Sequence, residues 1–455
     1  MSSQSHHTRP TATERWATEV VPRLPHNLEA QAVALGALRR HRGFASATLL
    51  LRGLLADALQ ASSLSELAAW GVLSDVADLA ASAWLKRLRA ATPWLSWLLS
   101  SLLGATPAVW LSAYGRWRAK VIDITTVGQS GGTGDDWRVH VSYDLLAGQF
   151  SHLVITDRSK GEHLDGMQRE PRDIAIVDAG DGRRHHIAAV AAQSADMVVR
   201  VYLPTCPIHD HHGKPLDLVK QLERRGRTPL ELHGCIEHGR SRIRVRVIAV
   251  PLPRENVAAA QQRLRKTARR KGRTASRSGL LLASWLVLVT TLPAEPWTAP
   301  AVVQLYRAGW QVEVVFKRLK QLLRLHQLRC TSAASAVPLL TLYLLAWVLS
   351  SEVAQGMRRA LAVAAAPAPV PRPGHWPEHE AVVSSWRVQQ VSLDLLRQQV
   401  WGEWTAARLR ECLPRLVRHL VTHPRQGGRD HQETVVRAHF TGQRFTRLRP
   451  LTVAE

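Results

Sequence analysis

The segment YRAGWQVEVVFKRLK, which begins at Tyr306, holds a single acidic residue together with a tyrosine and several basic residues. Tyr306, Glu313 and Lys320 follow one another at intervals of seven residues. Because an α-helix turns by about 100° per residue, steps of seven return to nearly the same face. Lys317 and Arg324 fall on that face too, four residues after Glu313 and Lys320. A single carboxylate in such a basic stripe is suited to holding a metal ion beside a polyphosphate backbone.

Two further carboxylates stand in apolar segments upstream of this stripe. Asp123 lies between Ile122 and Ile124 in a β-branched run, where a charge is costly unless it is paired or bound to metal. Asp178 ends the apolar run IAIVD, and ligands bind at the carboxyl ends of such strands in α/β folds. Each has a structural alternative: Asp123 could pair with an arginine at a strand edge, and Asp178 could cap a helix that begins near position 183.

The balance of charges indicates a polyanionic partner. The 455-residue chain carries 60 Lys and Arg residues against 36 Asp and Glu residues, a formal net charge of +24 at pH 7. A solvated basic surface is the simplest alternative, but an excess of this size points first to nucleic acid. Because 45% of the residues are hydrophobic, the chain can form a sizeable core and is not a disordered basic tail.

Cysteine usage and hydropathy favour a soluble cytoplasmic protein. Four cysteines, at positions 206, 235, 330 and 412, do not form a disulfide framework in a chain of this length. The first ten residues lack an apolar signal region, and the apolar run at 338–350 is too short to span a bilayer. We therefore expect no contact with a membrane.

Phosphoryl transfer on a nucleic acid would explain why three carboxylates are needed. The reaction uses two divalent ions about 3.5–4 Å apart, one at the attacking oxygen and one at the leaving oxygen. Mg²⁺ prefers oxygen ligands, and a few carboxylates on rigid elements hold it while leaving positions for water and phosphate. Asp123, Asp178 and Glu313 are our candidates for these ligands.

The elements that must position these carboxylates begin near residue 119. Segments rich in β-branched and aromatic residues predict three consecutive antiparallel strands, which are separated by short turns. A short apolar strand, a helix and another strand follow. This order of elements is that of the ribonuclease-H-like fold, in the α/β class. The segments are 119–128, 137–145, 149–157, 173–180, about 183–195 and 197–203.

The regions on either side of this core read mostly as helices. In the N-terminal region, Ser63 and Glu66 have capping-box spacing, Gly71 is expected to end that helix, and a second helix follows at about 75–90. The pair could be a helix-turn-helix, or part of a plain helical bundle with a solvated basic end. The expected parts are a helical DNA-binding domain at 1–115, a catalytic core at 116–335 completed by a helix at 300–328, apolar helices at 336–363, a Pro/Ala linker at 364–380, and a C-terminal helical region with a basic tail at 381–455.

A β-rich basic insertion is expected at about 204–280. In the segment RIRVRVIAV, Arg242, Arg244 and Arg246 alternate with apolar residues, which places them on one face of a strand as DNA contacts. The segment 263–277 holds eight basic residues and no acid. Two Cys-x-x-His pairs, at 206–209 and 235–238, have a spacing that zinc can use, but with 21 histidines in the chain chance explains them better.

The helix at 306–320 resembles the signature of DDE transposases of the "insertion sequence four" family. Their pattern is Tyr, two residues, Arg, three residues, Glu, six residues and Lys, and Tyr306, Glu313 and Lys320 match it in type and spacing. Gly309 stands where the family has its arginine, and Arg307 lies too far round the helix to replace it. The resemblance covers roughly residues 25–350. It places the first catalytic Asp in the opening strand, the second at the end of a later strand, and the Glu on a helix after a β-rich insertion.

The resemblance implies a ribonuclease-H-like catalytic core in which Asp123, Asp178 and Glu313 hold two Mg²⁺ ions, with Mn²⁺ as a possible substitute. It implies that Tyr306, Lys317, Lys320 and Arg324 contact phosphates. It also suggests that Trp285, at the start of the preceding strand, stacks on a base flipped out near the element end. A core position is the alternative for Trp285, because the chain has 16 tryptophans.

The resemblance further implies a bacterial enzyme that acts in the cytoplasm at the nucleoid, as a homodimer on double-stranded DNA. It would cut the terminal inverted repeats of an insertion sequence and join the freed 3′-hydroxyls to target DNA. Two alternatives stay open on the sequence. The chain could be a non-catalytic DNA-binding protein descended from a transposase, which Gly309 favours, or a nuclease of the same fold that hydrolyses without joining.

Overall fold

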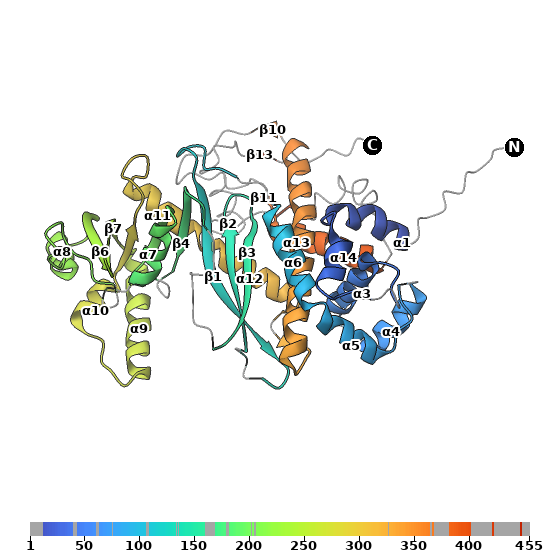
Figure 1. The fold of residues 1–455 in the computed structure, drawn as a ribbon. Helices are drawn as coiled ribbons and strands as arrows, with labels where there is room; N and C mark the ends of the chain where they lie inside the picture. Colours follow the sequence, from blue (N-terminus) through green and yellow to red (C-terminus); the bar gives the residue numbers. More distant parts are fainter. Residues whose placement is uncertain are drawn as a thin grey trace.

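A computed structural model describes most of the chain from residue 12 to residue 401, with two short pairs of residues beyond it. Its central element is a mixed β-sheet with helices packed on both faces (Figure 1). The described residues are 12–39, 43–60, 63–74, 76–105, 109–132, 134, 136–159, 169–178, 182–201, 203, 206–325, 327–364, 366–367, 382–401, 421–422 and 446–447.

The first five strands have the order expected of a ribonuclease-H-like sheet. The sheet runs β3-β2-β1-β4-β5 through this part. The first three strands are antiparallel, and β4 and β5 are parallel to β1. The strands are β1 (Arg118–Gln129), β2 (Trp137–Asp144), β3 (Gln149–Asp157), β4 (Asp173–Val177) and β5 (Asp196–Arg200). The prediction of three antiparallel strands followed by a short apolar strand, a helix and another strand is confirmed.

The insertion extends this same sheet. β8 pairs antiparallel with β5, β7 with β8, and β6 with β7. A helical hairpin connects β7 to β8. The elements are α8 (Leu218–Arg225), β6 (Leu230–His238), β7 (Ser241–Pro251), α9 (Arg254–Arg270), α10 (Arg277–Leu282) and β8 (Trp285–Thr290).

Two hydrophobic cores lie on the two faces of the sheet. In β4, Ile176 belongs to the larger core and Val177 to the smaller one, because successive side chains of a strand point to opposite faces. Helix α7 (Arg184–Ala192) covers the face with the smaller core. Helices α11 (Ala299–Ala308) and α12 (Gln311–Leu322) contribute to the larger core, with α11 against β4 and β5 and α12 against β1.

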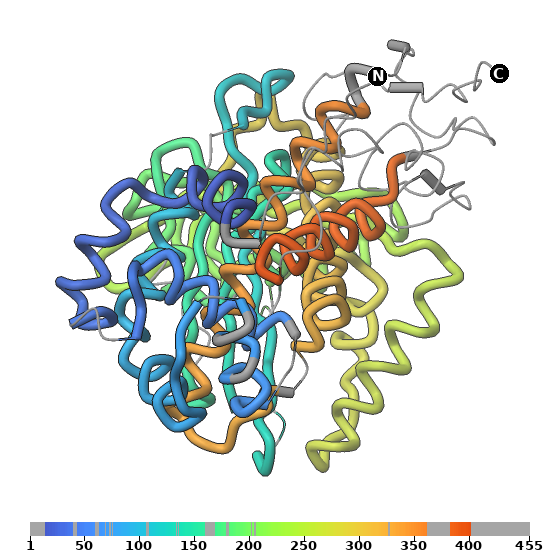
Figure 2. The backbone as a smooth tube through the Cα atoms, turned by 90° about the vertical axis from the view of Figure 1, so that its right-hand side faces the viewer, coloured from blue at the N-terminus to red at the C-terminus, as the bar shows by residue number. Residues whose placement is uncertain are grey.

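The N-terminal helices share the larger core with two late helices, α13 (Ala333–Ala364) and α14 (Ser385–Trp401) (Figures 1 and 2). The carboxylate of Asp57 pairs with Arg329 at 2.9 Å, and buried Arg52 donates to the carbonyl of Val400 at 2.8 Å. The N-terminal helical segments are α1 (Ala12–Arg15), a π-helix (Trp16–Val20), a 3₁₀-helix (Val21–Arg23), α2 (Leu28–Ala34), α3 (Ala47–Gln60), α4 (Leu64–Leu73), α5 (Ala81–Ala90) and α6 (Thr92–Gly104).

The region expected to be a helix-turn-helix is part of this packed bundle. The capping box is confirmed, because the Ser63 amide donates to Glu66 at 2.9 Å and the Glu66 amide to the Ser63 hydroxyl at 3.2 Å. The expected helix end at Gly71 is wrong, since α4 continues to Leu73. At the basic end of α5, Arg89 donates to the Ser335 hydroxyl of α13 at 3.0 Å. A DNA-binding role for this region therefore stays a prediction.

One continuous helix, α13, spans the region where apolar helices were expected at 336–363. By length and composition its segment Ala333–Leu361 is apolar enough to cross a bilayer, but 78% of its most apolar window is buried inside the protein. Helices α3, α6 and α14 and strand β3 pack around it. Burial by protein on so many sides is typical of a core helix.

The C-terminal predictions lie largely outside the described residues. Most of the Pro/Ala linker and of the basic tail falls there. The described parts are two short strand pairs, β10 (Ala366–Pro367) with β13 (Thr446–Arg447) and β11 (Val382–Val383) with β12 (Val421–Thr422).

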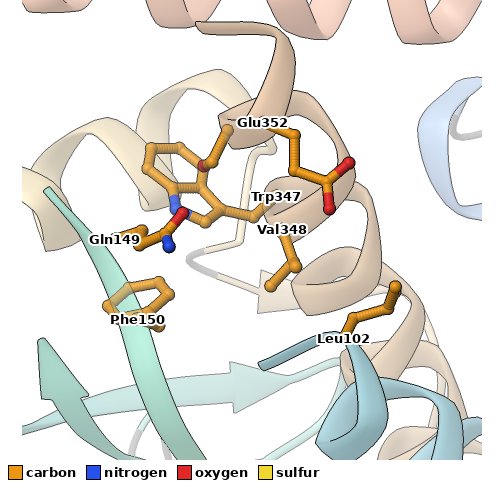
Figure 3. A pocket seen from close by; sticks show the side chains of 7 residues that line it. Leu102, Gln149, Phe150, Trp347, Val348 and Glu352 are labelled. Atoms are coloured by element: carbon orange, nitrogen blue, oxygen red, sulfur yellow. The ribbon is translucent and has the colours of Figure 1, made fainter. Parts of the chain in front are cut away.

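A small pocket lies between β3, α6 and α13 (Figure 3). Its lining residues include Phe150 and Trp347, whose rings are 6.4 Å apart, and Glu352, which pairs with Arg23 at 2.9 Å. Strand β3 is two strands away from β1 in the sheet. We assign this pocket to the packing of the helical bundle.

A buried carboxylate at the end of β2 makes stability depend on pH. Burial raises the pKa of Asp144 to about 6, although the Leu146 and Ala147 amides donate to it at 3.0 and 2.7 Å. The folded state therefore holds the proton more tightly than the unfolded state, and stability falls as pH rises through about 6. We expect Asp144→Asn to gain stability relative to wild type between pH 5 and pH 8, by on the order of 1–3 kcal/mol. Urea unfolding at the two pH values measures this, and an equal difference at both would contradict it.

Candidate active site

The two candidate aspartates stand side by side in the sheet. Strands β1 and β4 run parallel, with Ile122 paired to Val177. Asp123 and Asp178 are the next residues on their strands, and neighbouring strands are about 4.8 Å apart. Residues at matched positions of parallel strands point to the same face. Asp123 is half-buried and Asp178 is exposed, so the two carboxylates can share one ligand.

The register also brings an arginine to this row. Val177 on β4 is paired with Val199 on β5, so Arg200 stands beside Asp178 at the carboxyl end of the next strand. Arg200 interacts with the hydroxyl of Tyr306. Arg200 was not among the residues predicted from the sequence. Its signal was an arginine at the end of the buried strand MVVR, in the same place as the aspartate that ends IAIVD.

Tyr306 of α11 links the arginine to the aspartate. Its hydroxyl donates to the Oδ1 atom of Asp178 at 2.8 Å. Burial raises the pKa of Tyr306 above its usual value, the negative charge of Asp178 raises it further, and Arg200 offsets part of the effect. Tyr306 therefore remains a hydrogen-bond donor at neutral pH and holds the Asp178 carboxylate in one orientation.

The signature segment forms two helices, so the single continuous helix that was expected is wrong. Helix α11 ends at Ala308 and α12 begins at Gln311. Between them the Glu313 amide donates to the carbonyl of Trp310, three residues back, at 3.2 Å. Such a bond makes a tighter turn with fewer residues than an α-helix. The seven-residue spacing between Tyr306 and Glu313 therefore does not define one face.

Glu313 lies in the first turn of α12, which packs against β1. Val312, Val315 and Leu319 of this helix are buried, whereas Glu313 is exposed. Anchoring one side of α12 in the core leaves Glu313 on a rigid element next to the strand that carries Asp123.

Gly309, where the resembled family has arginine, packs against the sheet. A Cβ atom at this position would lie 2.8 Å from Cγ2 of Ile176 on β4 and 3.0 Å from the carbonyl oxygen of Tyr306. A side chain at this position requires a shift of the Ile176 side chain or of the backbone around it. Position 309 therefore faces the core in this chain.

Replacing Gly309 is expected to destabilise the protein despite the better helix propensity of the new residue. Because the Cβ atom overlaps Ile176, we expect Gly309→Ala to lower the free energy of unfolding by about 1–3 kcal/mol, and Gly309→Arg by more. Gly356 in α13 is the control, because a Cβ atom there meets nothing within 4 Å. Gly356→Ala should raise stability by up to about 1 kcal/mol. Equal effects at both sites in urea unfolding would contradict this packing.

The donor types fit a divalent metal, because carboxylate oxygens are the ligands that Mg²⁺ takes. In the part of the chain that the structure describes, no three His, Cys, Asp or Glu side chains lie close enough together to hold a metal ion. The register of β1 and β4 sets Asp123 beside Asp178, and Glu313 lies in the first turn of α12, which packs against β1. Orienting side chains by hydrogen bonds, as Tyr306 does for Asp178, is typical of metal ligands.

The predicted phosphate contacts separate into two groups. Lys317 and Lys320 lie on α12, where Lys317 is exposed and Lys320 is half-buried. Arg324 lies beyond the end of the helix, with a φ of 53°, so its placement on the helical stripe is wrong. Its side chain is exposed. All three remain candidates for contact with a DNA backbone.

Two tryptophans near the candidate site differ in exposure. Trp285 begins β8, is only 3% exposed and packs in the smaller core, so the core alternative describes it in this structure. Trp310, between α11 and α12, is 38% exposed and stands three residues before Glu313. Sequence analysis missed Trp310, although its position inside the signature segment was a signal.

The three insertion arginines have different surroundings. Arg242 and Arg244 are exposed, but Arg246 is only 5% exposed. Arg246 pairs with Glu231 at 2.7 Å and donates to the carbonyls of Leu292, Pro293 and Trp297. The prediction that Arg246 contacts DNA is therefore corrected: its guanidinium fastens β7 to the segment after β8.

The Cys-x-x-His pairs meet through their backbones. The amide of His209 donates to the carbonyl of Cys235 at 2.9 Å, and the amide of Cys235 donates to the carbonyl of His209 at 2.7 Å. Burial raises the pKa of the Cys206 thiol to about 11. Cys206 and Cys235 are both buried, and buried cysteines pack as small apolar side chains.

Comparisons of the sequence with known proteins find transposases. The sequence model of the family described as "Transposase DDE domain" matches residues 113–349. The chain is 34% identical over 338 residues to the "Putative transposase InsL for insertion sequence element IS186A" of Escherichia coli strain K12, covering 73% of this chain and 91% of the relative. It is also 34% identical over 339 residues to the "Transposase for insertion sequence element IS421" of Escherichia coli, with the same coverage.

Proposed function

This chain belongs to the DDE transposase family, and we propose that it cuts the ends of an insertion sequence and joins the freed 3′-hydroxyls to target DNA. Within this DNA transposase, Asp123, Asp178 and Glu313 would be the catalytic carboxylates. The register of β1 and β4, which brings Asp123 next to Asp178, is the observation that best supports this assignment, together with the packing of α12, the helix of Glu313, against β1.

The three carboxylates would hold two Mg²⁺ ions, which when bound activate the attacking oxygen and stabilise the leaving oxygen. Mn²⁺ would substitute. The chain's own residues orient the ligands: Tyr306 holds the Asp178 carboxylate, and the packing of α12 on β1 supports Glu313. Because these elements are rigid, little reorganisation is needed before an in-line displacement.

Arg200 would supply the cation that the family places at position 309. Its guanidinium stands in the row with Asp178 and interacts with Tyr306. An arginine can form two parallel hydrogen bonds to a phosphate and stabilise charge that develops during transfer. The missing arginine at position 309 therefore does not favour an inactive descendant, because another arginine stands beside the same carboxylate.

Lys317, Lys320 and Arg324 would contact phosphates and position the DNA without reading its sequence. The exposed indole of Trp310 would be available for stacking on an unpaired base. The enzyme would act in the cytoplasm at the nucleoid, as a homodimer on two DNA ends. Its N-terminal helices would also bind DNA.

Strand joining tests the proposal against a nuclease of the same fold. Purified protein would be incubated with a labelled, pre-cut terminal-repeat duplex, plasmid target and Mg²⁺, beside Glu313→Gln. A transposase links the labelled strand covalently to the plasmid, and the variant does not. Nicked products without joined ones would support the nuclease instead.

A further inference from the structure

Helix α9 and the turn after it form a basic arm that extends from the insertion and is separate from the candidate carboxylates. Helix α9 and the turn after it carry exposed cations, whereas α9 itself has a single acid, Glu255, in its first turn. Among the described residues, none of these cations forms an ion pair with an acid. They are Arg263, Arg265, Lys266, Arg269, Arg270, Lys271 and Arg273. In Figures 1 and 2 the yellow-green α9 stands away from the body of the molecule.

The arm is held in place by its other side. Val257, Leu264 and Ala268 are half-buried at helical spacing. The side-chain amide of Gln261 donates to the Leu280 carbonyl at 3.2 Å and to the Ser284 hydroxyl at 3.1 Å. The basic face of α9 therefore has a fixed direction relative to the sheet.

The arm leaves the sheet at the edge that carries the active site. β8 is antiparallel to β5, with Arg200 paired to Leu288, so Trp285 at the start of β8 lies beyond Arg200. β7 ends at Pro251 opposite Trp285. The hairpin of α9 and α10 thus begins about two to three strand spacings, roughly 10–15 Å, to the side of Asp178.

The dimensions of the arm match a DNA duplex. A helix of 17 residues is about 25 Å long. A duplex presents one negative charge for about every 1.7 Å of its axis, so a helix of this length can reach several phosphates. Because Arg246 is buried and bonded within the protein, it is not one of the DNA contacts of the insertion. The arm provides a larger set of cations near the carboxyl ends of the strands that carry the candidate site.

We propose that α9 binds the DNA backbone on one flank of the cleaved phosphate, through the exposed side chains of Arg265, Lys266, Arg269 and Arg270. This inference rests on the proposed function, because it requires DNA at the carboxylates. The contact would be independent of sequence and would contribute affinity and orientation.

Paired charge removals test the arm. Arg269→Gln with Arg270→Gln is compared with Lys214→Gln with Arg240→Gln, two exposed residues of the same insertion that lie near the opposite end of β7. Binding to terminal-repeat duplex is measured at several salt concentrations. We expect the arm variant to lose about tenfold in affinity and to lower the slope of log affinity against log salt by about two. In the control variant, we expect the affinity and the salt slope each to change by no more than about a third as much as in the arm variant.

Hydroxyl-radical footprinting of the same complexes locates the contact. The arm variant should lose backbone protection within about one helical turn on one side of the cut, and the control should keep it. Unchanged affinity, slope and protection in the arm variant, or equal losses in the control, would overturn the proposal. Failure of the wild type to bind or cut terminal-repeat DNA would instead reject the proposed function.

Discussion

Replacing Asp178 by asparagine is expected to abolish DNA cleavage while leaving the fold and DNA binding intact. The amide oxygen can still accept the hydrogen bond that the Tyr306 hydroxyl donates at 2.8 Å, so the local structure should persist. What is lost is a negative ligand oxygen for the metal. We expect the rate of end cleavage to fall at least about a thousandfold, which corresponds to roughly 4 kcal/mol of transition-state stabilisation.

Asp144→Asn is the matched control for this experiment. It makes the same exchange of a carboxylate for an amide, in a buried residue at the end of β2. Asp144 is paired with Lys120 of β1, which lies three residues before Asp123. Single-turnover cleavage with a terminal-repeat duplex should be nearly unchanged in the control. Residual cleavage above about a tenth of wild type in Asp178→Asn would remove this residue from the metal site.

Replacing Arg200 by glutamine is expected to slow cleavage about 10- to 100-fold with little loss of DNA affinity. The reason is that a guanidinium beside Asp178 would act on the phosphate that reacts, where charge develops, more than on the bound ground state. Arg200→Lys should recover part of the rate, because it restores the charge without the two-pronged hydrogen bonding. Single-turnover rates and binding constants together separate the two effects.

Arg307 gives the control for this prediction. It is an exposed arginine one residue after Tyr306, nearer in sequence to the family's arginine position. Arg307→Gln should leave the cleavage rate within about threefold of wild type. If Arg307→Gln slowed cleavage as much as Arg200→Gln, the assignment of the missing cation to Arg200 would be wrong.

The local patterns predicted the strands and their order well, because alternation and apolar runs report directly on burial. Asp123 and Asp178 could be found because a carboxylate inside or at the end of an apolar strand is costly without a ligand. Their alignment with Arg200 could not be found, since the register of parallel strands depends on contacts between segments far apart in the chain.

The signature helix shows where a spacing argument fails. Seven-residue steps describe one face only while the turn angle is constant, and the tight turn at Trp310 interrupts it. Gly309 inside a helical pattern was a warning of close backbone approach, but the partner, Ile176, comes from a strand more than a hundred residues earlier.

The insertion arginines show a second limit. Alternation placed Arg242, Arg244 and Arg246 on one face correctly, yet only part of that face is exposed. Arg246 stands where the segment after β8 crosses the strand, and the carbonyls of that segment satisfy it. A sequence pattern gives the face of a strand but not what covers it.

The central claim is that Asp123, Asp178 and Glu313 form one metal-dependent centre that cuts element DNA. The most direct measurement is cleavage of labelled terminal-repeat DNA in Mg²⁺ by wild type and by Glu313→Gln, with binding measured in parallel. We expect equal binding by both proteins and cleavage by the wild type alone. If both bind the DNA and neither cuts it, or if Glu313→Gln cuts as well as the wild type, the claim is contradicted.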